Sequence, residues 1–381
     1  MSKDKQPEIR FPGFTEAWEQ RKLGEIVQIT MGQSPNSENY TENPEDYILV
    51  QGNADMKNNR VVPRVWTTQV TKQAEKGDLI LSVRAPVGDI GKTDYDVVLG
   101  RGVAAVKGND FIFQKLRKMK ETGYWNRFST GSTFESINSN DIREALITIP
   151  DGEEQKKIGI FFKQLDDTIA LQQRKLDLLK ETKKGFLQKM FPKNGAKVPE
   201  IRFPGFTEDW EERKVGEIFK VTRGQVLAAT ETSESITEKN IYPVYSSQTK
   251  NDGLMGYYSD YLFDTAITWT TDGANAGTVN YRNGKFYSTN VNGVLLSDEG
   301  YANKAVAEII NRIAWKHVSK VGNPKLMNNV MSEITITIPS VEEQETISRF
   351  FTQLDSTITL HERELDLLKE TKKGFLQKMF V

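Results

Sequence analysis

The sequence has no cysteine and only two histidines, His317 and His361, among its 381 residues. Without cysteine the chain can form neither a disulfide framework nor a thiolate metal site, which fits a reducing compartment. Two histidines far apart in the sequence argue against a zinc site. The first 14 residues lack the apolar region of a signal peptide, and no run of 18 apolar residues exists. We therefore expect a cytoplasmic protein with no metal site and no membrane contact.

The chain also lacks any excess of charge, with a formal net charge of -1. Residues 26–150 hold 15 Lys and Arg against 15 Asp and Glu, and residues 218–339 hold 11 against 11. Proteins that bind phosphate backbones usually present a basic surface, so this balance alone argues weakly against a nucleic-acid binder. Any DNA-binding face must be a local patch.

Catalytic motifs are missing as well. There is no G-x-S-x-G motif, and there are too few histidines for a general base in most schemes. The stretch GDIGKT (residues 88–93) resembles a phosphate-binding P-loop, but Pro86 occupies the position of the first glycine. The sequence thus predicts no catalytic residue and no cofactor bound by this chain.

An internal repeat dominates what is present. LDLLKETKKGFLQKMF (residues 176–191) recurs at residues 365–380 with all 16 positions identical. Residues 7–26 match residues 199–218 at 17 of 20 positions. Between the shared blocks, the two long segments show no obvious similarity, so the order is constant, variable, constant, twice over. Such a layout suggests two different readers held by two nearly identical helices.

Each repeated helix carries a start signal and a heptad pattern. Asp151 is positioned to cap the first helix, and Ser340 with Glu343 forms a capping box for the second. Apolar residues then alternate at spacings of 4 and 3 over about 39 residues, or roughly 58 Å. The predicted seam consists of Ile158, Phe162, Leu165, Ile169, Leu176, Leu179 and Phe186, and of Ile347, Phe351, Leu354, Ile358, Leu365, Leu368 and Phe375.

A single narrow apolar stripe cannot be buried alone, so the two stripes most simply bury each other in an antiparallel coiled coil within one chain. Polar seam positions, Gln172, Lys183, His361 and Lys372, would set the register. The predicted fold is α/β (α+β), with two mixed α/β domains, two long helices and pseudo-two-fold symmetry. Its predicted domains are 1–150, a first helix 151–192, a linker 193–198, a second domain 199–339 and a second helix 340–381.

Both variable segments alternate strand-like runs with turn residues. Residues 111–124 and 301–315 are predicted helices, and Asn283-Gly284 is predicted to be a hairpin turn. Polar side chains near strand ends and glycine turns are of the types that bond phosphates and base edges, although ordinary loops share this composition. The candidate DNA-binding residues are Arg84, Lys92, Arg101, Ser132, Thr133, Thr271, Asn275, Thr278, Tyr281, Arg282, Lys285 and Asn290.

The whole layout resembles the specificity subunit of type I restriction-modification systems. The resemblance rests on W-x-x-x-K-[LV]-G-E-I (residues 18–26 and 210–218), I-P-x-x-E-E-Q (149–155 and 338–344) and the duplicated helix ending in F-L-Q-K-M-F. Residues 82–106, 131–137 and 273–289 look like that family's target-recognition domains. The resemblance implies a non-catalytic, double-stranded DNA-binding subunit whose two domains each read half of a bipartite asymmetric target.

The resemblance also implies partners. The family's helices space the two domains and dock two methyltransferase subunits, and motor-nuclease restriction subunits join for cleavage. S-adenosylmethionine, ATP and Mg²⁺ would be used by those partners. Two readers on one face of DNA should lie about 10–10.5 bp apart, which leaves an unread spacer of about 6–7 bp. The alternative is a coiled-coil scaffold that binds proteins without DNA specificity; a scaffold would not need two dissimilar variable segments.

Overall fold

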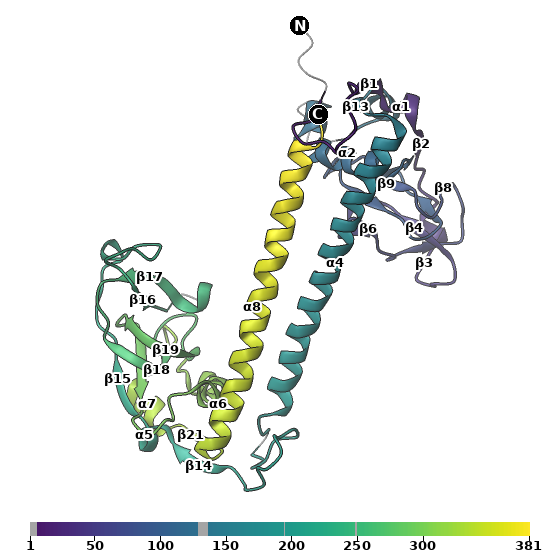
Figure 1. Ribbon diagram of the computed structural model, residues 1–381. Helices are drawn as coiled ribbons and strands as arrows, with labels where there is room; N and C mark the ends of the chain where they lie inside the picture. The colour runs from purple at the N-terminus through teal and green to yellow at the C-terminus, as the bar shows by residue number, and fades with distance from the viewer. Residues whose placement is uncertain (1–5, 129–135, 194, 248–249) are drawn as a thin grey trace. The chain divides into compact units, whose positions relative to one another are not determined.

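The computed structural model describes residues 6–128, 136–193, 195–247 and 250–381. The chain divides into two compact units. Unit 1 comprises residues 1–175 and 362–381, and unit 2 comprises residues 176–361. Each unit therefore contains one variable segment and one part of each long helix, α4 (Gly152–Lys189) and α8 (Val341–Lys378) (Figure 1).

Unit 1 folds its variable segment into two main sheets. Their strand orders are β2-β12-β9-β10-β6-β5 and β3-β7-β4-β11-β8, and β1 pairs with β13. The elements before α4 are β1 (Glu19–Lys22), α1 (Leu23–Ile26), β2 (Gln28–Met31), η1 (Ser37–Asn39), β3 (Tyr40–Thr41), β4 (Tyr47–Val50), η2 (Asn53–Asp55), β5 (Met56–Lys57), β6 (Arg60–Val61), β7 (Trp66–Thr67), β8 (Lys72–Ala74), β9 (Leu79–Ser82), β10 (Ile90–Lys92), β11 (Val97–Leu99), β12 (Val103–Lys107), α2 (Asp110–Glu121), η3 (Tyr124–Phe128), α3 (Ser139–Arg143) and β13 (Leu146–Ile149).

Unit 2 folds its variable segment around one sheet, in the order β15-β20-β18-β19-β16-β17, and β14 pairs with β21. Its elements are β14 (Glu211–Lys214), α5 (Val215–Ile218), β15 (Lys220–Arg223), η4 (Ala229–Glu231), β16 (Tyr242–Tyr245), η5 (Lys250–Gly253), β17 (Leu254–Tyr258), β18 (Phe263–Thr270), β19 (Val279–Ser288), β20 (Asn292–Leu296), α6 (Lys304–Ala314), η6 (Trp315–His317), α7 (Asn328–Glu333) and β21 (Thr335–Ile338).

The two units share one strand framework despite their dissimilar sequences. β2, β12 and β9 are antiparallel neighbours in unit 1, as β15, β20 and β18 are in unit 2. The long strand β19 takes the place of β10 and β11 together. It pairs antiparallel with β18 and parallel with β16, as β10 pairs antiparallel with β9 and β11 pairs parallel with β4. Buried apolar strands and one amphipathic helix, α2 or α6, form the core of each unit.

The predicted hairpin at Asn283-Gly284 is wrong. These residues lie inside β19, which pairs with β18 on both sides of them. The register shifts between Asp264 and Ala266 of β18, and Gly284 has a φ of +74°. A residue pair that favours positive φ can serve a bulge as well as a turn, and here it kinks one continuous strand.

The helix starts agree with the predicted caps. The backbone N–H groups of Glu153 and Glu154 donate to Asp151 Oδ1 at 2.8 and 3.0 Å. Glu343 N donates to Ser340 Oγ at 3.4 Å. Both helices span 38 residues. The predicted helices of the variable segments are also present, as α2 and α6.

Within unit 1 the two helix segments are antiparallel. Phe161 of α4 packs against Phe375 of α8 with ring centroids 5.1 Å apart, and Asp166 pairs with Lys372. Residues later in α4 therefore contact residues earlier in α8. In unit 2, Phe186 packs against Phe350 at 5.1 Å, and Lys183 pairs with Asp355 at 2.5 Å. The same antiparallel pairing therefore occurs in both units.

All 14 predicted apolar seam residues are buried or half-buried. The helix ends are buried as well, because the repeated F-L-Q-K-M-F enters a domain core in each unit. Phe380 lies 6.3 Å from the ring of Trp18 in unit 1, and Phe191 lies 6.2 Å from the ring of Trp210 in unit 2. The identity of the two repeats thus has a packing reason in addition to any shared partner.

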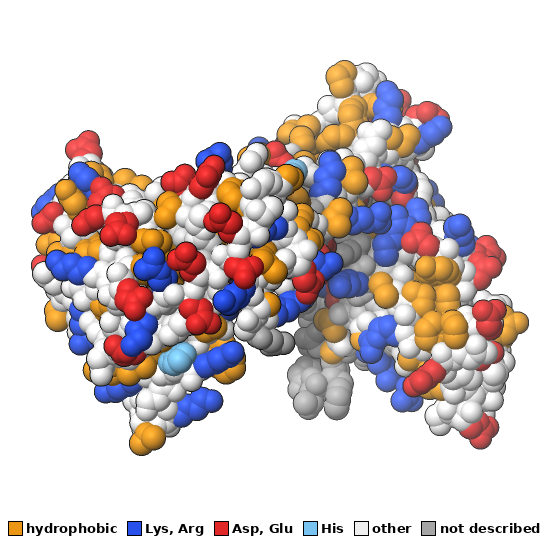
Figure 2. Space-filling view, turned by 90° about the horizontal axis from the view of Figure 1, so that it is seen from below, with side chains coloured by type: hydrophobic (Ala, Val, Ile, Leu, Met, Phe, Trp, Pro, Cys, Tyr) orange, Lys and Arg blue, Asp and Glu red, His pale blue; other side chains and the backbone are white. Residues whose placement is uncertain are grey.

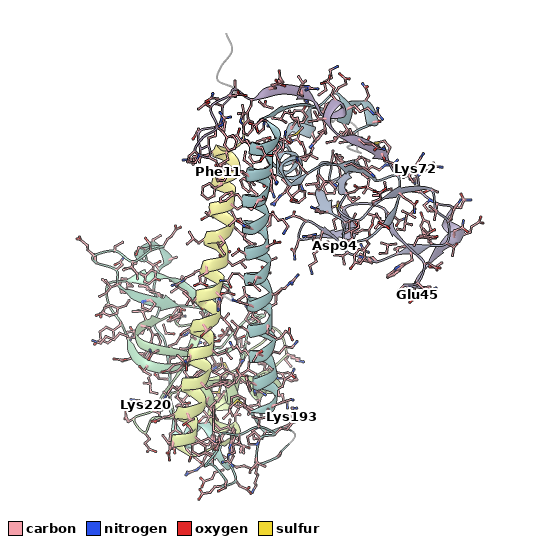
Figure 3. All side chains as sticks on the ribbon, turned by 45° about the vertical axis from the view of Figure 1, so that its right-hand side comes forward. Phe11, Glu45, Lys72, Asp94, Lys193 and Lys220 are labelled. Carbon is pink, nitrogen blue, oxygen red and sulfur yellow. The ribbon has the colours of Figure 1, made fainter. Side chains whose placement is uncertain are left out.

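The repeated P-E-I-R-F segment holds each helix start. Arg10 forms two hydrogen bonds of 2.7 Å with the fully buried Glu154, and Arg202 forms the same pair with Glu343. Phe11, which follows Arg10, packs edge-on against Phe161 at 5.9 Å (Figure 3). Each unit therefore ties its entry segment to its helices through a bidentate, largely buried ion pair.

Candidate nucleic-acid interface

Three loops of unit 1 meet at one edge of its sheets. Gly32 N, after β2, donates to Val103 O at 3.0 Å, and Val83 N, after β9, donates to Gly102 O at 2.9 Å. A side chain at Gly102 would place its Cβ 2.1 Å from the backbone oxygen of Gln51, so the turn requires glycine there. The G-R-G sequence thus brings the turn between β11 and β12 against its neighbours.

This edge exposes two of the predicted arginines. Arg101 stands on the turn between β11 and β12, where its backbone N–H donates to Ser34 Oγ at 3.1 Å. Arg84 follows β9, and its side chain is exposed. Lys92 lies further away and is paired with Asp110 at 3.0 Å, so its charge is already partly satisfied. Ser132 and Thr133 lie outside the described residues.

Unit 2 repeats the arrangement with other side chains. Gly224 N donates to Asn292 O at 3.1 Å, and Thr271 N donates to Val291 O at 3.0 Å. Asn290 therefore occupies the exposed turn position that Arg101 has in unit 1. The same backbone frame thus presents an arginine in one unit and an asparagine in the other, two side chains with different base preferences.

Three predicted residues of unit 2, Asn275, Thr278 and Arg282, line one polar cavity of about 60 Å³. The candidate list did not include its other lining residues, which come from β18, β19, β20 and the segment between β16 and β17. These are Ser246, Ser247, Asp252, Thr268, Thr270, Asn280 and Asn292. Strand alternation that places these side chains on one face was the available signal.

Two predicted residues serve the interior instead. Thr271 is 1% exposed, and its hydroxyl oxygen lies 2.6 Å from Asp272 Oδ2 and 3.0 Å from Val291 O. Tyr281 packs against the core of unit 2, and burial raises the pKa of its phenol. Thr271 is therefore buried and Tyr281 is half-buried, so neither side chain is fully exposed. Lys285 remains exposed, 4.5 Å from the ring centre of Tyr261.

A basic segment after α6, formed by η6 and the loop that follows it, was not predicted. Lys316, His317 and Lys320 are exposed there, and the neighbouring Val321 is 91% exposed. In unit 2 an isolated β-bridge joins Asp272 to Lys325. In unit 1 the equivalent isolated bridge joins Arg84 to Ser136. Lys325 therefore corresponds to Ser136 of unit 1.

Charge at the interface is local. Asp272 lies 3.6 Å from both Arg223 and Lys325, so two of the basic groups near the loops of unit 2 are partly neutralised. Over the part of unit 2 at the left of Figure 2, basic and acidic side chains are interspersed. Among the described residues, no three His, Asp or Glu side chains cluster as metal ligands. No helix in the described ranges could span a membrane.

Each unit also exposes two leucines on its long helices. Leu171 and Leu367 of unit 1 are 53% and 68% exposed, and Leu360 and Leu178 of unit 2 are 56% and 68% exposed. Leu171 corresponds to Leu360 in the repeat, and Leu367 corresponds to Leu178. Single exposed leucines are ordinary, but this pair is repeated on both units.

The sequence matches the family model "Type I restriction modification DNA specificity domain" twice, over residues 15–181 and 207–370. The chain belongs to this family. A putative type I restriction enzyme specificity subunit of Methanocaldococcus jannaschii is 32% identical over 177 residues, which are 44% of this chain and 41% of that protein. A putative type I specificity subunit of Mycoplasma pneumoniae is 40% identical over 139 residues, 35% of this chain and 72% of that protein.

Solved structures of the family share the fold. The crystal structure of the type I restriction-modification S subunit from M. genitalium has a TM-score of 0.72 at 16% identity and covers 99% of both chains. A chain from a study of the assembly and conformational transition of the type I system has a TM-score of 0.51 at 18% identity, over 98% of this chain and 99% of that chain. These likenesses confirm the predicted fold class of two mixed α/β domains and two long helices.

Proposed function

We propose that this chain is the sequence-reading subunit of a type I restriction-modification complex. Each unit reads one half of a bipartite, asymmetric double-stranded DNA target, and the chain itself is not catalytic. The observation that carries this proposal is the shared framework of the two units with different exposed side chains at equivalent loop positions, such as Arg101 and Asn290. Two readers of different half-sites need this combination of a common scaffold and dissimilar contacts.

The partners in this proposal are two methyltransferase subunits and the motor-nuclease restriction subunits. Repetition of exposed leucines on both units, Leu171 with Leu367 and Leu360 with Leu178, supports two equivalent docking surfaces. S-adenosylmethionine, ATP and Mg²⁺ act in the partner subunits. On the geometry of two readers on one face of B-DNA, the unread spacer is about 6–7 bp.

Methylation mapping tests the proposal directly. The chain is combined with its methyltransferase subunit, and the methylated positions of genomic DNA are sequenced. The expected target has two short specified halves with an unspecified gap. An uninterrupted target contradicts the spacer, and methyltransferase activity that does not depend on this chain contradicts the proposal in favour of a protein scaffold.

A domain exchange sharpens the assignment. Residues 27–148 are replaced by the equivalent segment of a relative, while the repeated blocks on either side stay unchanged. One half of the methylated target should change and the other should stay the same. Exchange of residues 219–337 is the matched control and should alter the opposite half. A change of both halves by either exchange would refute the modular reading.

A further inference from the structure

Arg282 is a buried cation without a carboxylate partner in the described residues. Its side chain on β19 is 5% exposed. Nε donates to Thr268 Oγ1 at 3.1 Å, and Nη2 donates to the backbone oxygen of Asp252 at 2.6 Å. The guanidinium carbon lies 3.7 Å from the ring centre of Tyr245. Burial of a charge without an ion pair is costly, and here burial lowers the pKa of the guanidinium.

Arg282 also lines the polar cavity. Its hydrogen bonds use Nε and Nη2, and the Tyr245 side chain interacts with the same guanidinium. Hydroxyl and amide side chains such as Ser246, Thr278 and Asn292 line the same space. Apart from Asp252, the residues that line the cavity around Arg282 are neutral, and a fixed guanidinium among neutral hydrogen-bonding groups is an arrangement suited to an oxyanion.

The equivalent strand position of unit 1 differs. In unit 2, Arg282 of β19 pairs with Ala266 of β18. At the equivalent position of unit 1, the backbone N–H of Thr93 donates to Asp78 O, so Thr93 corresponds to Arg282. Thr93 is a buried neutral residue whose hydroxyl donates to Tyr95 O at 2.7 Å. The buried cation is thus a property of the second domain and not of the shared framework.

We propose that the Arg282 cavity binds one phosphate group of the DNA backbone when unit 2 engages its half-site. This inference rests on the proposed function, which supplies DNA as the ligand. It assigns to Arg282 the role of positioning the duplex by contact with phosphate, while the exposed loop residues read bases.

The recess favours a phosphate over a base edge. Base edges lie on the floor of a major groove about 8.5 Å deep and are reached by protruding side chains. Phosphates form the outer rim of the duplex, so they can enter a recess in the protein surface. The cavity of about 60 Å³ accepts a few water molecules or one tetrahedral oxyanion.

Asp252 offers a test of whether the ligand of the cavity is an anion. Asp252 lines the cavity, and its carboxylate acts on Arg282 through space. It should repel an anion, whereas its backbone oxygen holds the guanidinium. Asp252 has a φ of +52°, a conformation that asparagine tolerates well, so Asp252→Asn removes the charge without backbone strain. This variant should bind DNA more tightly.

The experiment measures binding of the full chain to DNA duplexes of several sequences at varied salt. Arg282→Met should weaken binding about 10- to 100-fold for every sequence. The slope of log K against log salt should fall by about 0.9. Lys220→Gln is the matched charge control, because the exposed Lys220 lies at the opposite end of β15 from Arg223 and the loops (Figure 3). Its effect should be small.

A second measurement separates the cavity from DNA binding as a whole. Inorganic phosphate, compared with chloride at equal ionic strength, should raise the Tm of the wild type by a few degrees and leave that of Arg282→Met unchanged. Equal shifts in both proteins would overturn the phosphate site even if DNA binds. The site would also be overturned if Arg282→Met weakened binding only for targets that differ at one base. The same holds if Asp252→Asn did not bind DNA more tightly than the wild type. Failure of the wild type to bind DNA would instead refute the proposed function.

Discussion

The same lysine of the repeat meets two different environments in the two units. Lys372 and Lys183 are equivalent, and their partners Asp166 and Asp355 are equivalent too. In unit 1 the side chain of Lys372 is 5% exposed, whereas that of Lys183 is 31% exposed in unit 2. Identical helix sequence therefore does not produce identical electrostatics.

The difference comes from the domain that covers each helix pair. Asp166 also accepts from Gln114 Nε2 at 2.8 Å and lies 3.4 Å from Arg117, both on α2. Asp355 instead pairs with Lys304 at the start of α6. A repeated seam thus tolerates two unlike domains because each domain supplies its own counter-groups to the same aspartate. The following predictions test how far the two units behave alike.

The largest effects should come from the ion pair that is the same in both units. Arg10→Met and Arg202→Met each leave a fully buried glutamate unpaired, so each should reduce the free energy of unfolding by about 3–5 kcal/mol. Urea unfolding measures the loss, and hydrogen exchange assigns it to unit 1 or unit 2. Losses that differ by more than about 1 kcal/mol would break the equivalence of the two anchors.

The seam aspartates should separate the units. Asp166→Asn leaves buried Lys372 beside Arg117 without its ion-pair partner, and we expect a loss of about 3 kcal/mol. Asp355→Asn involves partly exposed lysines and should cost about 1 kcal/mol. Both substitutions preserve shape, so each serves as the control of the other under the same unfolding assay. Equal losses would show that the domain cover does not matter.

Stability should depend on pH through Lys372. Burial lowers the pKa of Lys372 to about 8, below its usual 10.5, despite Asp166. Between these values the unfolded chain binds a proton that the folded chain does not, so stability rises with pH, by up to about 1.4 kcal/mol per unit. Urea unfolding from pH 8 to 10 should show a smaller rise in Lys372→Met than in the wild type.

Lys115 provides the comparison for this pH effect. Burial lowers its pKa to about 8 as well, and it also belongs to unit 1. Lys115→Met should therefore remove a similar part of the rise, and the double variant should remove more of it than either single variant. An unchanged slope in all three variants would contradict the assignment.

The smallest effect on stability should come from the exposed helix leucines. Leu178→Ser and Leu367→Ser should each change the free energy of unfolding by less than about 0.5 kcal/mol. Under the proposed function, both should weaken association with the methyltransferase subunit to the same extent, as measured by titration. The exposed equivalent pair Glu181→Gln and Glu370→Gln is the control. Strong loss from only one leucine would indicate unequal docking surfaces.

Much of the fold could be predicted because its signals are local or repeated. The heptad spacing predicted the helices and their seam, and Asp151 and Ser340 predicted the caps. Arg101 was a candidate because it lies near glycine turns, and the structure places it on an exposed turn where Gly102 approaches Gln51 closely. The candidate residues Thr271 and Tyr281 could not be sorted from Asn275 and Thr278, since residue type does not reveal which way a side chain points.

The sequence by itself determined the duplicated plan, because identical residues at heptad spacing specify the same helix wherever they occur. Only the tertiary structure decided that Arg282 is buried beside a polar cavity and that Lys372 is buried while Lys183 is partly exposed. It also decided that Asn283-Gly284 makes a bulge. Burial and strand register depend on contacts between residues far apart in the chain, and no local pattern encodes those contacts.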